Sequence, residues 1–235
     1  MKNYSLQKSD YKNILTGKSK EHLASHPQLA VELHQQLVPA LVDLQQKALQ
    51  EGFDLRVVSG FRSYERQQLI WEEKLSGKRK IFSHDGKNLL SVDSLSDQEK
   101  VDSILRWSAF PGTSRHHWGS DFDLYDANAI AKEDLQLIPS EYLEGGPLHP
   151  LTLWLDDLID GNEIPFFKPY REDHDGVAIE PWHLSYRPIA DSFLQLYTLE
   201  LFQEVVASSN LPIKEIILDN AAFYYNRYVA LMPIA

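Results

Sequence analysis

The order of helical and strand-like segments constrains the fold of this chain more than any other feature. Apolar residues at helical spacing run through 37–49, and a short strand-like segment follows at 55–58. Two helical segments, 63–77 and 97–107, then precede the next strand-like segment at 120–126. A doubly wound parallel sheet requires regular alternation of strand and helix, which this chain lacks. The sequence therefore predicts an α+β fold.

The second half of the chain keeps this irregular order. Its predicted elements are, in chain order, a helix over 149–160, a strand over 177–186, helices over 189–206 and 213–222, and an edge strand over 224–232. No internal repeat or low-complexity tract occurs, and no Gly/Ser/Pro-rich linker divides the 235 residues. We therefore expect a single domain that spans 1–235.

The composition excludes several classes of site and partner. The chain has no cysteine, which excludes disulfides, thiolate metal sites and cysteine nucleophiles. Its net charge of −11 argues against binding to nucleic acid, which requires a clustered basic face. No apolar run approaches the roughly 20 residues that a membrane span needs. The polar N-terminus lacks the apolar core of a secretory signal, so we expect a cytoplasmic protein, or a periplasmic one if a leader was removed.

One short stretch, SRHHWGSDFDLYD, gathers the side chains that a metal site without cysteine needs. Histidine nitrogens and carboxylate oxygens are the ligands that remain for zinc. Residues two apart on a strand share a face, so Asp121 and Asp123 make one face of this strand acidic. A turn through Gly119 can bring His116 or His117 back beside that face. Spacing alone leaves both histidines as candidates.

A second cluster, EPWH, carries one more carboxylate and one more histidine. Glu180 and His183 are three apart, which places them on opposite faces of a regular strand. Both can face one metal only if the backbone turns at Pro181. Each side chain also has a purely structural interpretation, such as a histidine packed beside Trp182 or a solvated aspartate pair. The residues alone thus indicate a metal site without naming a reaction.

Three separated motifs, in this order, resemble one family. SGFRS at 59–63 with Gln67 matches S-G-[YF]-R-S-x-x-x-Q, the segment 114–123 matches S-x-H-x-x-G-x-A-x-D except at its alanine, and EPWH at 180–183 is identical. The sequence resembles the zinc D-alanyl-D-alanine carboxypeptidases of the VanY type and their LD-carboxypeptidase relatives. The resemblance covers roughly residues 14 to 188. It implies a small, mainly antiparallel sheet flanked by helices, of the Hedgehog/DD-peptidase type.

The resemblance also separates the candidate ligands. The implied ligands of one Zn²⁺ are His116, Asp123 and His183. His117 and Asp121 are expected near the metal but not bound to it. Glu180 takes the catalytic acid/base position, and Arg62 aligns with an arginine that stabilises the polarised carbonyl. The positions implied to contact substrate are Arg62, Gln67, Ser114, Trp182 and Tyr186.

The activity that the resemblance implies is zinc-dependent removal of the terminal D-alanine from peptidoglycan stem peptides, by DD- or LD-carboxypeptidase action. The expected partner is a stem peptide or a muropeptide. Two alternatives stay open. The chain could be an endopeptidase or dipeptidase that cuts another bond of the same peptides, or a non-catalytic, zinc-stabilised cell-wall-binding module.

Three departures from the family pattern carry further expectations. Asp121 replaces the usual alanine, and we expect its side chain to be solvated rather than bonded to a ligand. Ser185 stands where many relatives carry arginine, so a substrate or structural contact of that arginine is expected to be missing. The long polar segment 77–111 is a candidate for part of the cleft wall.

Overall fold

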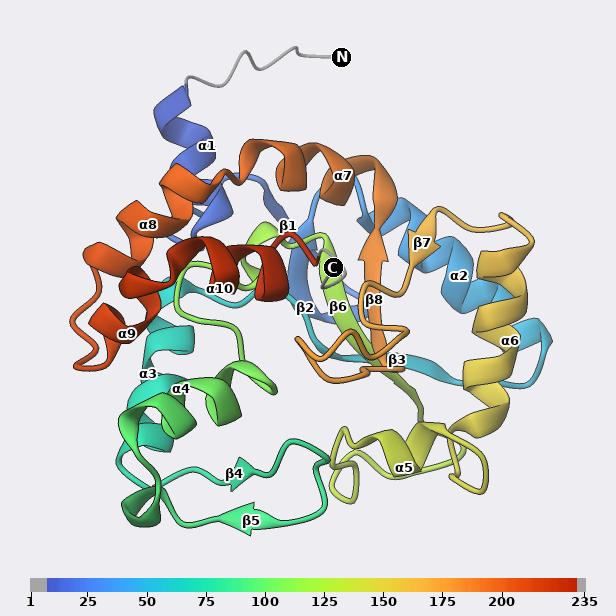
Figure 1. Cartoon of the computed structure of the whole chain (residues 1–235). Helices are drawn as coiled ribbons and strands as arrows, with labels where there is room; N and C mark the ends of the chain where they lie inside the picture. Colours follow the sequence, from blue (N-terminus) through green and yellow to red (C-terminus); the bar gives the residue numbers. More distant parts are fainter. Residues whose placement is uncertain (1–7, 232–235) are drawn as a thin grey trace.

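A four-stranded sheet forms the centre of the fold (Figure 1). Its strands, in spatial order, are β3 (Leu55–Ser59), β6 (Asp121–Asp126), β8 (His183–Tyr186) and β7 (Phe166–Phe167). Every pairing between neighbours in this sheet is antiparallel. The structure, a computed structural model, describes residues 8–231. It confirms the predicted α+β fold with a small antiparallel sheet flanked by helices.

One face of this sheet is apolar and is covered by two helices, α2 (Val38–Gln50) and α6 (His149–Asp160). Phe122 and Leu124 of β6 are buried in the same cluster as Leu44 of α2. Because side chains alternate along a strand, Asp121 and Asp123 of β6 lie on the opposite face. The alternation that buries the core therefore also positions the polar site.

The other helices, apart from the short α5 (Pro139–Tyr142), share a second buried cluster. They are α1 (Lys8–Leu15), α3 (Tyr64–Leu75), α4 (Asp97–Leu105), α7 (Arg187–Leu196), α8 (Leu199–Ala207), α9 (Lys214–Asp219) and α10 (Ala221–Tyr228). Trp71 of α3, Ile104 of α4 and Phe202 of α8 meet there. Within the described residues, no helix is both long and apolar enough to cross a membrane. The expectation of one domain over 1–235 stays a prediction.

The remaining elements are short. They are the hairpin of β1 (Leu23–His26) and β2 (Leu29–His34), the hairpin of β4 (Ile81–Phe82) and β5 (Leu89–Leu90), and the 3₁₀ helices η1 (Val92–Ser94) and η2 (Arg115–Trp118). The segment 77–111 thus holds a small hairpin, η1 and α4. Its expected place in a cleft wall stays a prediction.

Local sequence signals account for several helix boundaries. The Ser63 side chain accepts a hydrogen bond from the Arg66 backbone N at 3.2 Å and caps α3. Pro39 lies in the first turn of α2, where its missing N–H leaves no intrahelical bond unmade.

The predicted edge strand over 224–232 is wrong. Residues 221–228 form α10, and residue 232 lies outside the described residues. Ala221, Tyr224 and Tyr228 follow helical spacing and are buried in the second cluster. Aromatic and β-branched residues favour strands locally, but packing of this helical face onto α8 and α9 decides the outcome.

Two buried histidines pack together beside the β1–β2 hairpin. His22 and His34 are each 5% exposed, and their ring centroids lie 5.6 Å apart. Burial lowers the pKa of His22 to about 4. Burial, with the neighbouring His22, lowers the pKa of His34 to about 4. Both side chains are therefore neutral in the folded protein near neutral pH.

The free energy of unfolding is expected to fall as the pH drops from about 6.5 toward 4. The unfolded chain takes up protons on both histidines near the ordinary pKa of about 6.5, whereas the folded protein does so only near 4. The unfolded state thus binds more protons across this window, and each histidine contributes a slope of up to about 1.4 kcal/mol per pH unit. Urea unfolding at a series of pH values measures the effect.

A His22→Leu variant isolates this contribution. It removes one of the two buried groups, so its stability should depend less steeply on pH than that of the wild type. His174, whose side chain is 50% exposed, provides the control, and His174→Asn should keep the wild-type slope. Parallel stability curves for His22→Leu and the wild type would contradict the interpretation.

Candidate active site

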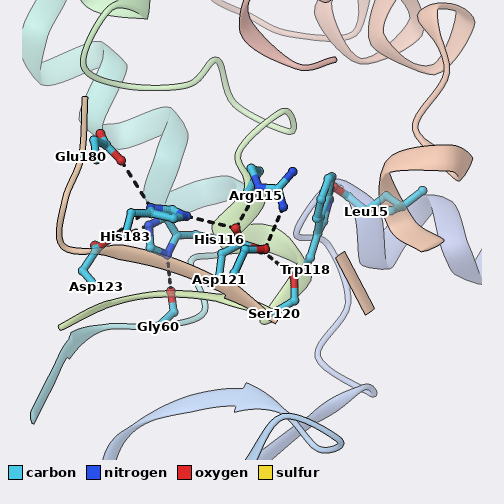
Figure 2. Close-up of polar contacts among 11 residues, drawn as sticks. Leu15, Gly60, Arg115, His116, Trp118, Ser120, Asp121, Asp123, Glu180 and His183 are labelled. Atoms are coloured by element: carbon cyan, nitrogen blue, oxygen red, sulfur yellow. Dashed lines mark hydrogen bonds and ion pairs between the residues drawn. The ribbon is translucent and has the colours of Figure 1, made fainter. Parts of the chain in front are cut away.

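Three side chains that could hold a metal ion meet on one face of the central sheet, at its two middle strands (Figure 2). His116 comes from η2, Asp123 from β6 and His183 from β8, and all three are buried. One ligand atom from each lies within 4.8 Å of the others. Asp123 and His183 face each other directly across the antiparallel pair of β6 and β8. The sheet register therefore fixes two of the three positions.

A glycine turn brings the third side chain back to the sheet. Gly119 follows η2 with φ +66°, in the left-handed region. A Cβ at this position would lie 2.6 Å from Leu23 Cδ2 and 2.9 Å from the backbone N of His34. Only glycine fits such a close approach, and the turn places His116 Nε2 3.4 Å from Asp123 Oδ2.

The neighbouring His117 lies outside this cluster. Its Nδ1 is 2.6 Å from the Arg62 carbonyl oxygen, and its Nε2 accepts a hydrogen bond from Gly112 N at 3.0 Å. Burial lowers the pKa of His117 to about 3. Both ring nitrogens are thus used to join three segments of backbone. His117 lies beside the cluster without contributing to it, as the family resemblance implied.

The backbone turns at Pro181, which sequence analysis identified as the condition for a joint site. The His183 backbone N donates to the Glu180 carbonyl oxygen at 3.1 Å across this turn. Glu180 Oε2 then lies 3.3 Å from His183 Nδ1. The Glu180 backbone N also donates to the Tyr170 carbonyl oxygen at 2.9 Å, which fixes the loop. The side chain of Glu180 is 16% exposed and lies at the margin of the cluster (Figure 2).

The arrangement of ring nitrogens fits a bound metal ion. His116 Nδ1 is 2.9 Å from the Gly60 carbonyl oxygen, and His183 Nε2 is 3.0 Å from Asp121 Oδ1. Each histidine therefore has one nitrogen bonded to the protein and the other turned toward Asp123. His183 Nδ1 and Asp123 Oδ1 are buried and, within the described residues, make no hydrogen bond. Two histidines and one carboxylate are a known ligand set for catalytic zinc.

The electrostatics of the cluster favour a cation. Burial alone would raise the pKa of Asp123, but His116 and His183 hold the pKa of its carboxyl well below its usual range. Burial opposes a charge on His183, yet its contacts with Asp121, Asp123 and Glu180 raise its pKa well above the ordinary value. Carboxylates thus surround this imidazole and attract positive charge.

Arg62 and its partners lie next to the cluster. Its Nη1 donates to Gln67 Oε1 at 3.0 Å, and its backbone N donates to the His116 carbonyl oxygen at 3.1 Å. Burial lowers the pKa of Arg62, while Asp123 and Glu180 act in the opposite direction. The three sequence motifs are therefore joined at one place.

The other predicted substrate residues have mixed surroundings. Ser114 is 3% exposed at the start of η2. Trp182 is 5% exposed and packs on Tyr142, with ring centroids 5.4 Å apart. Tyr186 is half-buried and packs on Phe166, with ring centroids 5.6 Å apart. Their contacts with substrate stay predictions.

Lys74 is a residue that sequence analysis missed. It is 6% exposed and shares the buried face of α3 with Gln67, seven residues earlier. Burial, with the nearby Arg79 and Arg62, lowers the pKa of Lys74 to about 8. The spacing of two helical turns from Gln67 is the sequence signal that could have found it. Lys74 is therefore a buried lysine on the same face of α3 as Gln67.

One expectation about the departures is corrected by the structure. Asp121 is not solvated but 0% exposed, because η2 packs on this face of β6. The contact expected to be missing at Ser185 stays a prediction. Arg115 Nη2 donates to Ser185 Oγ at 2.7 Å, so an arginine from another element reaches this position.

Comparison with known proteins agrees with this geometry. A family model described as "VanY: D-alanyl-D-alanine carboxypeptidase" matches residues 30–189. The chain belongs to this family. The matched region contains all three motifs and ends shortly after β8.

Individual proteins similar to this chain differ in how much of it they cover. An uncharacterized protein of Haemophilus influenzae is 46% identical over 99 residues, which are 41% of this chain and 67% of that protein. The vancomycin resistance D,D-pentapeptidase VanY, solved in complex with Zn(II), has a TM-score of 0.50 and 23% identity, covering 76% of this chain and 86% of that one. The LdcB LD-carboxypeptidase has a TM-score of 0.52 and 19% identity, covering 93% and 88%. At these identities the two structures show a shared fold.

Proposed function

We propose that this protein is a zinc-dependent carboxypeptidase that removes the terminal D-alanine from peptidoglycan stem peptides. The observation that carries the proposal is the buried cluster of His116, Asp123 and His183 with a fourth, acidic side chain beside it. Glu180 lies 3.3 Å from His183 yet is more exposed than the three candidate ligands. Because the chain belongs to a D-alanyl-D-alanine carboxypeptidase family, we propose the terminal D-alanine as the leaving group.

The proposed reaction divides the work between metal and protein. Zinc in such a site supplies Lewis-acid polarisation of a peptide carbonyl and of the attacking water. Glu180 accepts the proton of that water as it attacks and then delivers the proton to the leaving amine of the terminal residue. The Glu180 backbone is anchored to Tyr170 through a hydrogen bond of 2.9 Å, which holds the base at the margin of the cluster.

Positive side chains have two tasks in this proposal. Arg62 opposes the negative charge that develops on the carbonyl oxygen, and its bond to Gln67 Oε1 at 3.0 Å limits its rotation. Carboxypeptidases also bind a free terminal carboxylate. Lys74, together with Arg62, Gln67 and Ser114, supplies the charge and hydrogen-bond donors for that group. A non-catalytic binding module is less well supported, because such a module has no use for a base beside a complete ligand set.

Digestion of defined stem peptides tests the proposal directly. The protein is expected to release alanine from pentapeptide stems, to lose this activity on treatment with a chelator, and to regain it when Zn²⁺ is restored. Mass spectrometry of the products identifies the bond that is cut. Release from pentapeptides indicates DD-carboxypeptidase action, whereas release from tetrapeptides alone indicates LD action. Cleavage inside the peptide would instead identify an endopeptidase, and no chelator-sensitive product would contradict the enzyme proposal.

A further inference from the structure

Four side chains that depart from the family pattern, or lie at its variable positions, form one buried network beside His183. Arg115, Ser120 and Asp121 are labelled in Figure 2. Arg115 Nε donates to Asp121 Oδ1 at 2.8 Å, and Arg115 Nη2 donates to Ser185 Oγ at 2.7 Å. Ser120 Oγ donates to the second oxygen of Asp121 at 2.6 Å. The exposed fractions are 5% for Arg115 and 0% for Asp121 and Ser185. The carboxylate of Asp121 is therefore held from two sides.

The same carboxylate contacts a candidate metal ligand. Asp121 Oδ1 lies 3.0 Å from His183 Nε2, while Asp123 Oδ1 lies 3.3 Å from His183 Nδ1. Asp121 and Asp123 are two residues apart on β6 and so share one face of the strand. Two carboxylates from one strand thus contact the two ring nitrogens of His183, one at each nitrogen. A bond at Nε2 leaves Nδ1 free to bind a metal ion.

Ring orientation is the property that this contact controls. An imidazole that ligates through Nδ1 must carry its proton on Nε2, and an acceptor at Nε2 fixes both this tautomer and the ring angle. A buried carboxylate without a counter-charge would be costly, and the Arg115 guanidinium supplies that charge. The position of Arg115 is itself fixed, because its Cζ lies over two aromatic rings. It is 4.8 Å from the ring centroid of Trp118 and 5.5 Å from that of Phe167.

We propose that Arg115 and Asp121 form a positioning pair, which holds the His183 ring with Nε2 bonded to the protein and Nδ1 directed to the metal. Arg115 acts through Asp121, and Asp121 acts through His183. Neither side chain is expected to touch the substrate. This inference rests on the proposed metal site, since it assigns the orientation of one of its ligands.

Zinc affinity of purified variants tests the pair without reference to turnover. Asp121→Ala should weaken Zn²⁺ binding about 10- to 100-fold, the usual effect of losing the acceptor behind a ligating histidine. Asp121→Asn keeps an acceptor oxygen and should weaken binding less. Asp126 lies on the same strand and accepts from the Asp54 backbone N at 2.8 Å, away from the cluster, so Asp126→Asn is the matched control. Competition with a chromophoric chelator measures each dissociation constant.

Nitrogen NMR of the His183 ring gives a second readout. In the Zn²⁺-bound wild type the proton is expected on Nε2 with Nδ1 on the metal, whereas Zn²⁺-bound Asp121→Ala should show a mixture of rings bound through Nδ1 and through Nε2. A purely structural role for Asp121 would change the urea midpoint but leave tautomer and zinc affinity as in the wild type. That result would overturn the proposal.

A double variant separates positioning from the burial of a lone charge. Asp121→Ala leaves Arg115 without its partner, so this variant could lose zinc simply by unfolding. Combining it with Arg115→Met removes both charges and should restore stability but not zinc affinity. Full recovery of zinc affinity in the double variant would overturn the proposal. A wild type that binds no Zn²⁺ would overturn the proposed function as well, whereas equal zinc binding by all variants would overturn the positioning pair alone.

Discussion

Glu180→Gln is expected to lower kcat for alanine release by about 10²- to 10⁴-fold, the usual contribution of a general acid–base group. Glutamine keeps the size of the side chain but can neither accept the proton of water nor deliver it to the leaving amine. Zinc affinity should change little, because Glu180 is not part of the three-residue cluster that could hold a metal ion. The variant therefore separates catalysis from metal binding.

The measurement combines two assays on the same preparation. Steady-state release of alanine from a defined pentapeptide gives kcat, and chelator competition gives the dissociation constant for Zn²⁺. Glu172→Gln is the matched control, since the Glu172 side chain belongs to the same loop but is 77% exposed. Retention of wild-type turnover by Glu180→Gln would refute its role as the base. Loss of zinc along with turnover would instead assign it to the metal.

Asp123→Ala is expected to abolish both zinc binding and activity. Asp123 lies between the two histidines, 3.4 Å from His116 Nε2 and 3.3 Å from His183 Nδ1, so its removal leaves only two protein ligands. A metal that binds only the folded state stabilises it by about 2.7 kcal/mol when its free concentration is 100 times Kd. Zinc should therefore raise the unfolding temperature of the wild type and leave that of Asp123→Ala unchanged.

Thermal unfolding with and without Zn²⁺ provides the measurement. A companion variant, Asp123→Asn, keeps the shape of the side chain while removing its charge, and it should lose most of the zinc-dependent shift. Asp126→Asn removes a carboxylate from the far end of the same strand and should keep the full shift. Persistence of the shift in Asp123→Ala would place the metal elsewhere.

Strand alternation predicted which residues of β6 share a face, and the structure agrees. It could not decide between His116 and His117, since that choice depends on the backbone path through η2 and on the left-handed conformation of Gly119. The family resemblance made the choice, and the hydrogen bonds of His117 to Arg62 and Gly112 explain it physically.

The solvation of Asp121 was predicted wrongly, as was the edge strand over 224–232. A strand pattern shows which residues share a face but not what covers that face. Here the cover includes Arg115 from η2 and Ser185 from β8, which are 70 residues apart in sequence. Lys74 was missed for a similar reason, because a lysine near the end of a helix is usually solvated, and only the packing of α3 buries it.

The C-terminal helices lie beyond the region that the family model matches, but they pack into the same hydrophobic core. The match ends at residue 189, yet Phe202, Ile217 and Tyr224 from beyond it belong to the same buried cluster as Trp71 and other residues within it. The edge of sequence similarity therefore runs through a hydrophobic core rather than between two cores. A fragment that ends at residue 189 would expose to solvent the apolar surface that the C-terminal helices bury in the intact protein. The part of the chain that carries the three motifs therefore depends for its solubility on helices that carry none of them.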